Sequence, residues 1–594
     1  MQRLALELQE WTFQIDQNDR GEQLEWFRPG YDRSGWMAVE VPKPWDFYQE
    51  AFWGYEGMGW YAASFKLDQS ARDTWERIIF NSVSGHARVW LNGTYLGEHF
   101  GTYLPFEFNV TPFLAAEGNN ELIIKVDNCH REDWLPGGRV VEWIQYGGIL
   151  QPVVVETTSR AYIAAVHIRT AVSEAGPATV RAEVEIINAA DQALEGEIGL
   201  QCSTDEGVIE KLLRISCPSG AGSANQATSF SFEFEIAKPL LWDLDTPHLY
   251  NLQVTLIERG DIRDHADERF GIRTISRDGS TILLNGTPLI IKGVNRYDEY
   301  AGYGPSVPHH LIREDLIKIK QMGANLVRVH YPQHPIHLDI MDEIGLLYMS
   351  EIPLNWWLSE WDDRPYIPEV IDKAEVALEE MIGRDGNHPC IIAWSMCNES
   401  GTNKEVGIAA MRRLIRRTRE LDSTRLVTFA TTGSGGHLAF EEADLVCVNL
   451  YYGVFFHRKI AYEIEEFDEI VRIPTEEHLR ATAAEYPDKA VVMSEFGTPA
   501  ILGLKGKDRF SETYQAAYLA SVWQAIVNTG IQGGVIWSWA DYYHRRDFYD
   551  SEGGLKWSAP YGPFGVVTID RKEKEGYHTI SRLFRNGQER KGRN

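Results

Sequence analysis

The chain has 594 residues, a length typical of three or four globular domains. Hydrophobic residues make up 44% and charged residues 24%, which are ordinary proportions for a protein with packed cores. The formal net charge of −28 argues against nucleic acid or an anionic membrane as a partner, because both require clustered Lys and Arg. An anionic small substrate is not excluded, since a pocket can be locally basic.

The six cysteines include no CxxC pair, and we interpret them as reduced thiols, mostly buried. The first residues, MQRLALELQEWTFQID, lack the long apolar stretch of a signal peptide. No run of about 18 apolar residues suggests a membrane span. We therefore expect a cytoplasmic protein with no membrane partner.

Residues 1–158 read as a series of short strands without a convincing helix. The segment RVWLNGTYLGEHF (88–100) alternates apolar and polar residues around Asn92-Gly93, a dipeptide typical of a two-residue hairpin turn. Residues 159–274 continue with strands such as TVRAEVEIINA and HLYNLQVTLIE, separated by turns at the spacing of an immunoglobulin-like sandwich. We expect one β-sandwich in each region.

From residue 275 to residue 594 eight apolar runs alternate with helical segments. Continuous apolar runs are typical of strands buried on both faces of a parallel sheet. Helical spacing is clear in 309–323 and 366–383, where Gly323 and Gly383 stand at the expected C-caps. This pattern predicts a (β/α)8 TIM barrel. The runs are LIIKGVN, NLVRVHY, LLYMSEI, CIIAWSMCNE, RLVTFAT, DLVCVNLYY, AVVMSEFG and GGVIWSWAD.

The residues that end these runs are carboxylates, amides and aromatics. In such a barrel the active site lies at the C-terminal ends of the strands. Two carboxylates can cleave a glycosidic bond, and aromatic rings supply flat apolar faces for a pyranose. The sequence therefore predicts sugar chemistry at the rim. The terminal residues include Asn295, Arg296, Asp298, His330, Glu351, Asn398, Glu399, Asn449, Tyr451, Glu495 and Trp537.

Three barrel segments carry a family resemblance: NLVRVHYPQHPIHLDIMDEIGLLYMSE (325–351), RDGNHPCIIAWSMCNESG (384–401) and VVMSEFG (491–497). They resemble the two signatures and the nucleophile strand of glycoside hydrolase family 2. WYAASF, VWLNGTYLGEHFGTYLPFEFNVT and YGGI are similar to the N-terminal jelly roll of that family, so the resemblance covers the whole chain. NLYYG and VIWSWAD are closest to β-glucuronidases, whereas NESG is closer to β-galactosidases.

The resemblance implies a retaining exo-β-glycosidase in which Glu399 is the acid/base and Glu495 the nucleophile. Their carboxyl groups are then expected about 5–5.5 Å apart. The remaining residues would bind or orient the sugar. Asn398 would hydrogen-bond the 2-hydroxyl, Tyr451 would orient the nucleophile, and His330 and Trp537 would line the subsite. Further substrate contacts are expected from Arg296, Asp298, Asn449 and, on a jelly-roll loop, Glu142.

The sequence favours a neutral sugar, and among these a β-galactoside. Glucuronidases carry an Asn-x-Lys pair that grips the uronate, and SAPYGPFGVVTIDRK (558–572) lacks it. Burying a uronate without a cationic partner is unfavourable. A β-glucuronide or another β-uronide stays the alternative, with Arg545 and Arg546 as a substitute clamp.

Two other classes of function remain. His330, His334 and His337 could bind zinc, but no HExxH motif accompanies them, and Pro332 and Pro335 interrupt any helix there. A non-catalytic carbohydrate-binding protein is disfavoured because both carboxylates are present. No GxxxxGK[ST] motif occurs and no GxGxxG follows a strand, so we expect no cofactor. The aglycone and homo-oligomer formation stay open.

Overall fold

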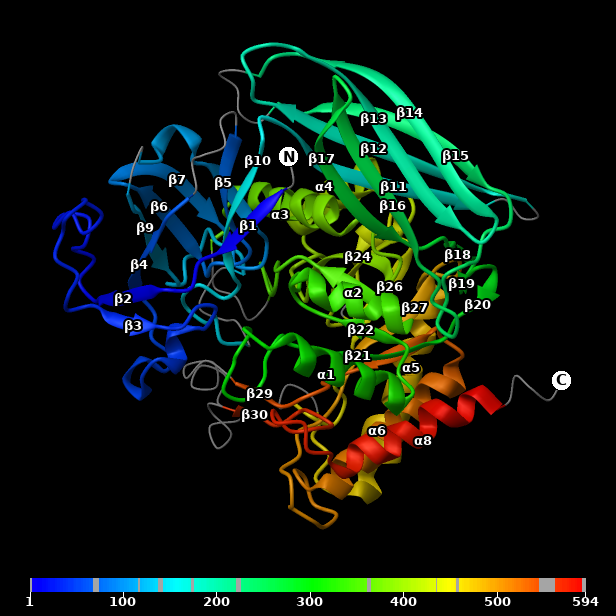
Figure 1. Ribbon diagram of the computed structural model, residues 1–594. Coiled ribbons are helices and arrows are strands. Elements are labelled where there is room, and N and C mark those ends of the chain that lie inside the picture. Colours follow the sequence, from blue (N-terminus) through cyan, green and yellow to red (C-terminus); the bar gives the residue numbers. More distant parts are fainter. Residues whose placement is uncertain are drawn as a thin grey trace.

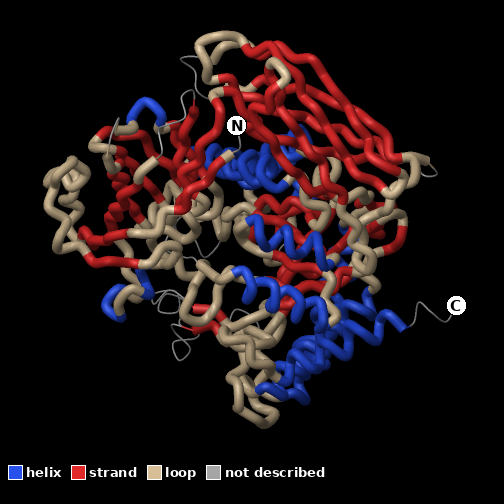
Figure 2. Tube along the Cα trace, viewed as in Figure 1, coloured by secondary structure: helices blue, strands red, loops and turns tan. Residues whose placement is uncertain are grey.

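The computed structural model describes residues 3–67, 74–115, 118–136, 143–172, 176–220, 226–359, 365–433, 435–455, 459–543 and 561–589. In chain order these residues form two β-sandwiches and a closed eight-stranded barrel wrapped by helices (Figures 1 and 2). The predicted fold class is thereby confirmed. None of the helices in these ranges combines the length and the apolar character that crossing a bilayer requires.

The N-terminal sandwich packs two antiparallel sheets over an apolar core that includes Phe13, Tyr61 and Ile124. The predicted hairpin is confirmed: Asn92 and Gly93 adopt φ values of 51° and 80° between β6 and β7, as a two-residue turn of this kind requires. One sheet has the order β1 (Leu4–Glu7), β10 (Val153–Ser159), β5 (Thr74–Phe80), β8 (Phe106–Asn109). The other has the order β3 (Met37–Val39), β2 (Trp11–Asp16), β4 (Met58–Phe65), β9 (Asn120–Asp127), β6 (His86–Leu91), β7 (Thr94–Phe100).

The second sandwich buries alternate residues of its strands, so that Val180, Val184 and Ile186 of β12 face its core. It rests on the barrel through Trp242, whose indole N–H donates to the Asp342 carbonyl at 2.8 Å. One sheet has the order β11 (Ala161–Val172), β12 (Ala178–Asn188), β15 (Thr228–Ile236). The other has the order β14 (Gly207–Cys217), β13 (Leu194–Thr204), β16 (Tyr250–Glu258), β17 (Asp261–Phe270).

The eight apolar runs are the eight parallel strands of the barrel, and almost every residue in them is buried. Burial on both faces explains why the runs are continuously apolar rather than alternating. The strands are β21 (Ile291–Asn295), β22 (Leu326–Arg328), β23 (Leu347–Glu351), β24 (Ile391–Asn398), β25 (Leu426–Thr431), β26 (Leu445–Asn449), β27 (Ala490–Phe496) and β28 (Gly533–Ile536).

Helices surround this barrel on the outside (Figure 1). Between β25 and β26 the described chain forms a short 3-10 helix, Leu438–Glu441, where an α-helix would complete the pattern. The α-helices are α1 (His309–Met322), α2 (Pro335–Ile344), α3 (Glu369–Asp385), α4 (Glu405–Leu421), α5 (Ile473–Glu485), α6 (Glu512–Thr529) and α8 (Glu575–Glu589). Short strands β18 (Ile275–Asp278), β19 (Thr281–Leu284) and β20 (Thr287–Pro288) precede the barrel, and β29 (Tyr542–Tyr543) pairs with β30 (Tyr561–Gly562) after it.

One of the two predicted helix ends is correct. Gly323 follows α1 with φ 97°, the left-handed conformation of a glycine C-cap. The end predicted at Gly383 is wrong, because α3 continues through Gly383 to Asp385. Ile382 continues the buried apolar face of this helix, and Asp385 is buried in an ion pair with Arg384 at 2.6 Å. These contacts offset the cost of about 1 kcal/mol for an internal glycine.

The N-terminal sandwich contacts the strand-end rim of the barrel. The rings of Tyr103 and Tyr331 stack with centroids 4.1 Å apart, and Trp143 packs against Tyr331 at 5.5 Å. The Tyr146 hydroxyl donates to the carboxylate of Glu299. Two domains therefore build this side of the rim together.

Replacing Trp242 by alanine is expected to lower the free energy of unfolding by about 3–5 kcal/mol, because it empties a fully buried site between the second sandwich and the barrel. Urea unfolding followed by circular dichroism measures the loss. Leu212→Ala, on a side chain 63% exposed on β14, serves as the control and should change stability by less than about 0.5 kcal/mol. Equal losses in the two variants would contradict this description of the joint.

Candidate active site

Two glutamates lie at the ends of β24 and β27, and both are buried. Glu399 directly follows β24 and is 9% exposed, and Glu495, within β27, is 4% exposed. The backbone of Glu399 has φ 47°, a left-handed conformation that is unfavourable by about 1–3 kcal/mol for a residue with a side chain. Its N–H nevertheless donates to the Ala430 carbonyl of β25 at 2.9 Å, which holds the strained residue in place.

Side chains from two segments, the end of β22 and the loop after β26, surround the Glu495 carboxylate. Arg328 at the end of β22 donates to Oε1 at 2.8 Å, and the Tyr451 hydroxyl donates to Oε2 at 2.7 Å. Nε2 of His330 lies 3.6 Å from Oε1. One donor on each oxygen fixes the plane of the carboxylate, as the position of an attacking nucleophile requires.

Arg328 is fully buried, and its guanidinium joins several groups of the site. Besides Glu495 it donates to Glu351 at 2.9 Å and to the side-chain oxygen of Asn398 at 2.9 Å. Burial lowers the pKa of Arg328, but the carboxylates of Glu351 and Glu495 together hold this pKa above its ordinary value. Burial likewise opposes ionisation of Glu351, yet Arg328 and His330 hold the pKa of this carboxyl below its usual range.

Glu399 has a different environment. Its Oε1 accepts from Nδ2 of Asn449 at 2.8 Å and its Oε2 from the indole N–H of Trp356 at 2.9 Å. Burial, followed by the charge of Glu495, raises the pKa of Glu399 to about 7. A carboxyl group with such a pKa can hold a proton near neutral pH and release it to a leaving group.

Two amides connect the glutamates. The Asn398 side-chain oxygen accepts from Asn449 at 3.0 Å, and its own Nδ2 donates to Asn355 at 2.9 Å. Ser494, next to Glu495, donates to Asn449 at 2.6 Å. The amide planes are thus set by hydrogen bonds within the site.

An aromatic wall stands beside the nucleophile. His330 packs between Trp143 of the sandwich and Trp537 after β28, with ring centroids 5.8 and 5.1 Å away. Tyr297 lies 5.4 Å from Trp537 and also contacts Trp143. Such rings offer apolar faces to the C–H side of a sugar.

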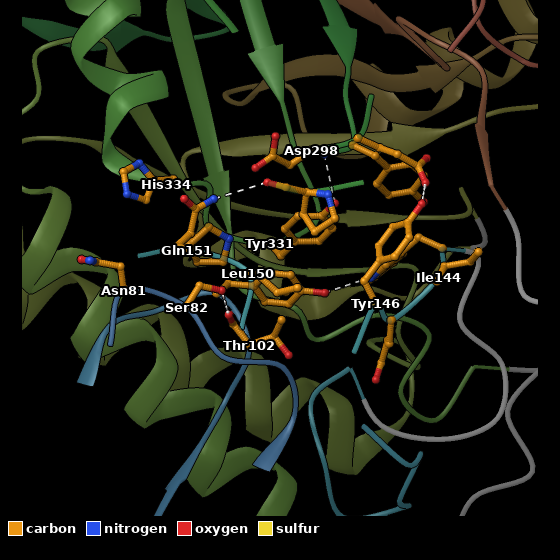
Figure 3. A pocket seen from close by; sticks show the side chains of 17 residues that line it. Asn81, Ser82, Thr102, Ile144, Tyr146, Leu150, Gln151, Asp298, Tyr331 and His334 are labelled. Carbon is orange, nitrogen blue, oxygen red and sulfur yellow. Dashed lines mark hydrogen bonds between the residues drawn. The ribbon is translucent and has the colours of Figure 1, made fainter. Parts of the chain in front are cut away.

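A cavity lies between the sandwich and the barrel, and Tyr297 is part of its lining (Figure 3). Tyr146 and Leu150 of the sandwich lie there near Asp298 and Tyr331 of the barrel. Burial is the main cause that raises the pKa of Glu299, another lining residue, to about 7. The cavity thus belongs to the joint between the two domains.

The structure brings together Glu399, Glu495, Asn398, Asn449 and Tyr451, with His330 and Trp537 beside them. Arg296 and Asp298 make other contacts. Arg296 is ion-paired with Asp315 of α1 at 3.1 Å and lies 3.5 Å from Asp298, which also faces His337 of α2. These contacts tie the rim to the helices, and a sugar contact for either residue stays a prediction. Glu142, Arg545 and Arg546 lie outside the described residues.

Sequence reasoning omitted Arg328, Trp143 and Trp356 from the site. Arg328 had a signal, because a charged residue inside an otherwise apolar strand run must find buried partners. Trp143 and Trp356 stand in loops, and no periodicity indicates where a loop side chain points.

The histidines weighed as zinc ligands have separate partners in the structure. His330 faces Glu351 at 2.8 Å, whereas His337 faces Asp298 at 3.1 Å. Within the described ranges no three His, Cys, Asp or Glu side chains gather as metal ligands would.

Comparisons with known proteins identify one family along the whole chain. Sequence models of glycosyl hydrolases family 2 match the chain in three consecutive parts: the sugar binding domain at residues 10–158, the family's middle segment at 161–273 and the TIM barrel domain at 275–586.

Relatives of two specificities resemble the chain. A β-glucuronidase from Paenibacillus borealis is 26% identical over 95% of this chain and 94% of its own length. A β-galactosidase from Thermoanaerobacter pseudethanolicus is 32% identical over 62% of this chain. The matched region is 49% of that relative, so the chain spans about half its length.

Among solved structures, a GH2 β-galacturonidase from Eisenbergiella tayi bound to galacturonate superposes with a TM-score of 0.84. It is 25% identical, and the match covers 98% of this chain and 97% of that one. Since the barrel model alone covers more than half of the residues, the chain belongs to glycosyl hydrolase family 2.

Proposed function

We propose that the protein is a retaining exo-β-glycosidase in which Glu399 is the acid/base and Glu495 the nucleophile. The observation that carries this proposal is the contrast between the two carboxyl groups. Arg328 and Tyr451 bind Glu495, whereas burial and the neighbouring charge raise the pKa of Glu399 to about 7. Two carboxyl groups whose environments differ in this way can divide the roles of nucleophile and proton donor.

In the first step Glu495 attacks the anomeric carbon while Glu399 gives its proton to the glycosidic oxygen, and the bond between that carbon and oxygen breaks. The ester formed with Glu495 carries no charge, so one cause of the raised pKa of Glu399 disappears. In the second step Glu399 is therefore suited to take a proton from water, which attacks the anomeric carbon and releases Glu495.

Among neutral and charged sugars, the described part of the site favours a neutral one, and NESG favours a β-galactoside. Arg328 is paired with Glu351 and Glu495, Arg571 with Asp315 at 2.6 Å. Lys574 is likewise buried against Asp541 at 2.6 Å. A uronate placed here would have to share a cation that already neutralises a buried carboxylate.

A β-hexuronide is the second candidate, favoured by the relatives that match almost the whole chain. These are the Paenibacillus enzyme, a β-glucuronidase, and the Eisenbergiella enzyme, a β-galacturonidase. A cation for the uronate would then come from Arg545 or Arg546 in the segment after Tyr543.

The pH profile of kcat/KM tests the acid. Glu399 must be protonated in the first step, and it is protonated below its pKa of about 7. With an aryl glycoside that has a poor leaving group, kcat/KM is therefore expected to fall as the pH rises through about 7. A profile that stays flat to pH 9 would contradict the assignment.

Replacements of the two glutamates separate their roles. Glu495→Gln should be nearly inactive on every glycoside, since no ester can form. Glu399→Gln should retain glycosylation of a dinitrophenyl glycoside, whose leaving group needs no proton, but lose about 10²–10⁴-fold on a phenyl glycoside. The measurement is single-turnover release of the phenol. Equal losses on both leaving groups would refute Glu399 as the acid.

The sugar is tested by the ratio of kcat/KM for 4-nitrophenyl β-galactoside and 4-nitrophenyl β-glucuronide. A neutral-sugar site should prefer the galactoside. A preference of more than about tenfold for the glucuronide, worth about 1.4 kcal/mol in the transition state, would reject that view. Arg545→Gln and Arg546→Gln should then reduce glucuronide turnover and spare the galactoside.

A further inference from the structure

The side chain of Trp356 reaches the proposed acid/base from a loop that follows β23. Its Nε1–H donates to Oε2 of Glu399 at 2.9 Å, and Asn449 donates to Oε1. Trp356 is half-buried, so this hydrogen bond lies at the edge of the site rather than in its floor. An indole N–H is a permanent donor, because it neither accepts a hydrogen bond nor titrates.

Several hydrogen bonds fix the loop against the end of β24. The backbone N–H of Trp356 donates to the Asn398 carbonyl at 2.9 Å, and the N–H of Asn398 donates to Leu354 at 3.0 Å. The Gly401 N–H donates to the Trp357 carbonyl at 2.7 Å. The loop is thus bonded to Asn398, directly before Glu399, and to Gly401, two residues after it.

Trp356 has φ 54°, a left-handed conformation that tryptophan rarely adopts. Glu399, its partner, is also left-handed, at φ 47°. Two strained residues that share a side-chain hydrogen bond indicate that the surrounding contacts favour this particular pairing over relaxed backbones.

We propose that Trp356 is a positioning residue for Glu399, which orients the carboxyl group toward the leaving group and stabilises its ionised form when it acts as a base. The inference rests on the proposed function. One donor on each oxygen leaves one lone-pair direction per oxygen for the catalytic proton. The indole bond is strongest when the carboxyl is ionised, which is its state in the attack of water.

The charged groups that face Glu399 act in opposite directions. Glu495 on β27 disfavours its ionisation, whereas Arg328 on β22 favours it. The donors from β26 and from the loop, Asn449 and Trp356, favour ionisation as well. Replacing Arg328 or Asn449 would also break a side-chain hydrogen bond to Asn398, and Asn449 accepts from Ser494 as well. The indole of Trp356 donates to Glu399 itself, so its replacement changes this carboxyl group most directly.

The test is the Trp356→Phe variant, which keeps an aromatic ring and removes the donor. The pKa of Glu399 should rise by about one unit, because a hydrogen bond to a charged group is lost. The alkaline limb of kcat/KM for phenyl β-galactoside, or for the aryl glycoside that the wild type prefers, should move up by the same amount. The kcat for a dinitrophenyl glycoside, limited by the second step, should fall about tenfold while its kcat/KM changes little.

A second readout needs no turnover. The protein is labelled with ¹³C-glutamate and titrated in the infrared. Subtracting the spectra of the matching Glu399→Gln protein leaves the signal of Glu399, which reports its pKa directly. Absence of turnover by the wild type on every glycoside would refute the proposed function, whereas the infrared shift would still decide what Trp356 does to this carboxyl.

Trp357→Phe is the matched control. Trp357 is the next residue and is fully buried, and its Nε1 has no hydrogen-bond partner within the described part of the chain. This variant should lose packing and stability, but the pKa of Glu399 should stay unchanged in both the kcat/KM profile and the infrared titration. An unchanged pKa in Trp356→Phe, or the same shift in Trp357→Phe, would overturn the proposal.

Discussion

The buried guanidinium of Arg328 is the group on which the geometry of the site depends. It joins Glu351, Asn398 and Glu495 from three different strands, and each bond is 2.8–2.9 Å long. A buried cation without partners would be unfavourable by several kcal/mol, so the carboxylates and the cation require one another. The same bonds hold the nucleophile, whereas the hydrogen bonds to the Glu399 carboxyl come from the neutral side chains of Asn449 and Trp356, which is why the two glutamates differ.

This arrangement extends outward through side chains rather than through backbone alone. His330 connects Glu351 to the aromatic wall, and Trp143 brings the N-terminal sandwich onto that wall. The ion pair of Arg296 with Asp315 fixes the neighbouring part of the rim to α1. Arg571, which follows the last barrel strand, pairs with the same aspartate. The barrel strands determine which residues stand at the rim. These buried polar and aromatic contacts determine where their side chains point.

The sequence predicted what periodicity and strand endings can predict. The eight apolar runs, the hairpin at Asn92-Gly93 and the helix end at Gly323 follow from local patterns, and the structure contains all of them. The helix end predicted at Gly383 was wrong because a residue after this glycine is still buried on the inner face of α3. A glycine marks a helix end only where the buried face stops. The place of Arg296 after an apolar run did not indicate that its side chain turns toward Asp315. Likewise, no local pattern indicated that Trp356 reaches Glu399, because each contact depends on a partner elsewhere in the chain.

The packing of Trp143 on His330 has a consequence for heat inactivation. Barrel strands are held by ladders of hydrogen bonds on both sides, whereas the sandwich is joined to the rim by a few stacked rings and side-chain bonds. Mild heating that separates the two bodies would uncover the histidine beside the nucleophile while the strands and helices persist. Activity would then be lost at a lower temperature than the far-ultraviolet circular dichroism signal. Cooling would restore the activity as long as the barrel had not unfolded.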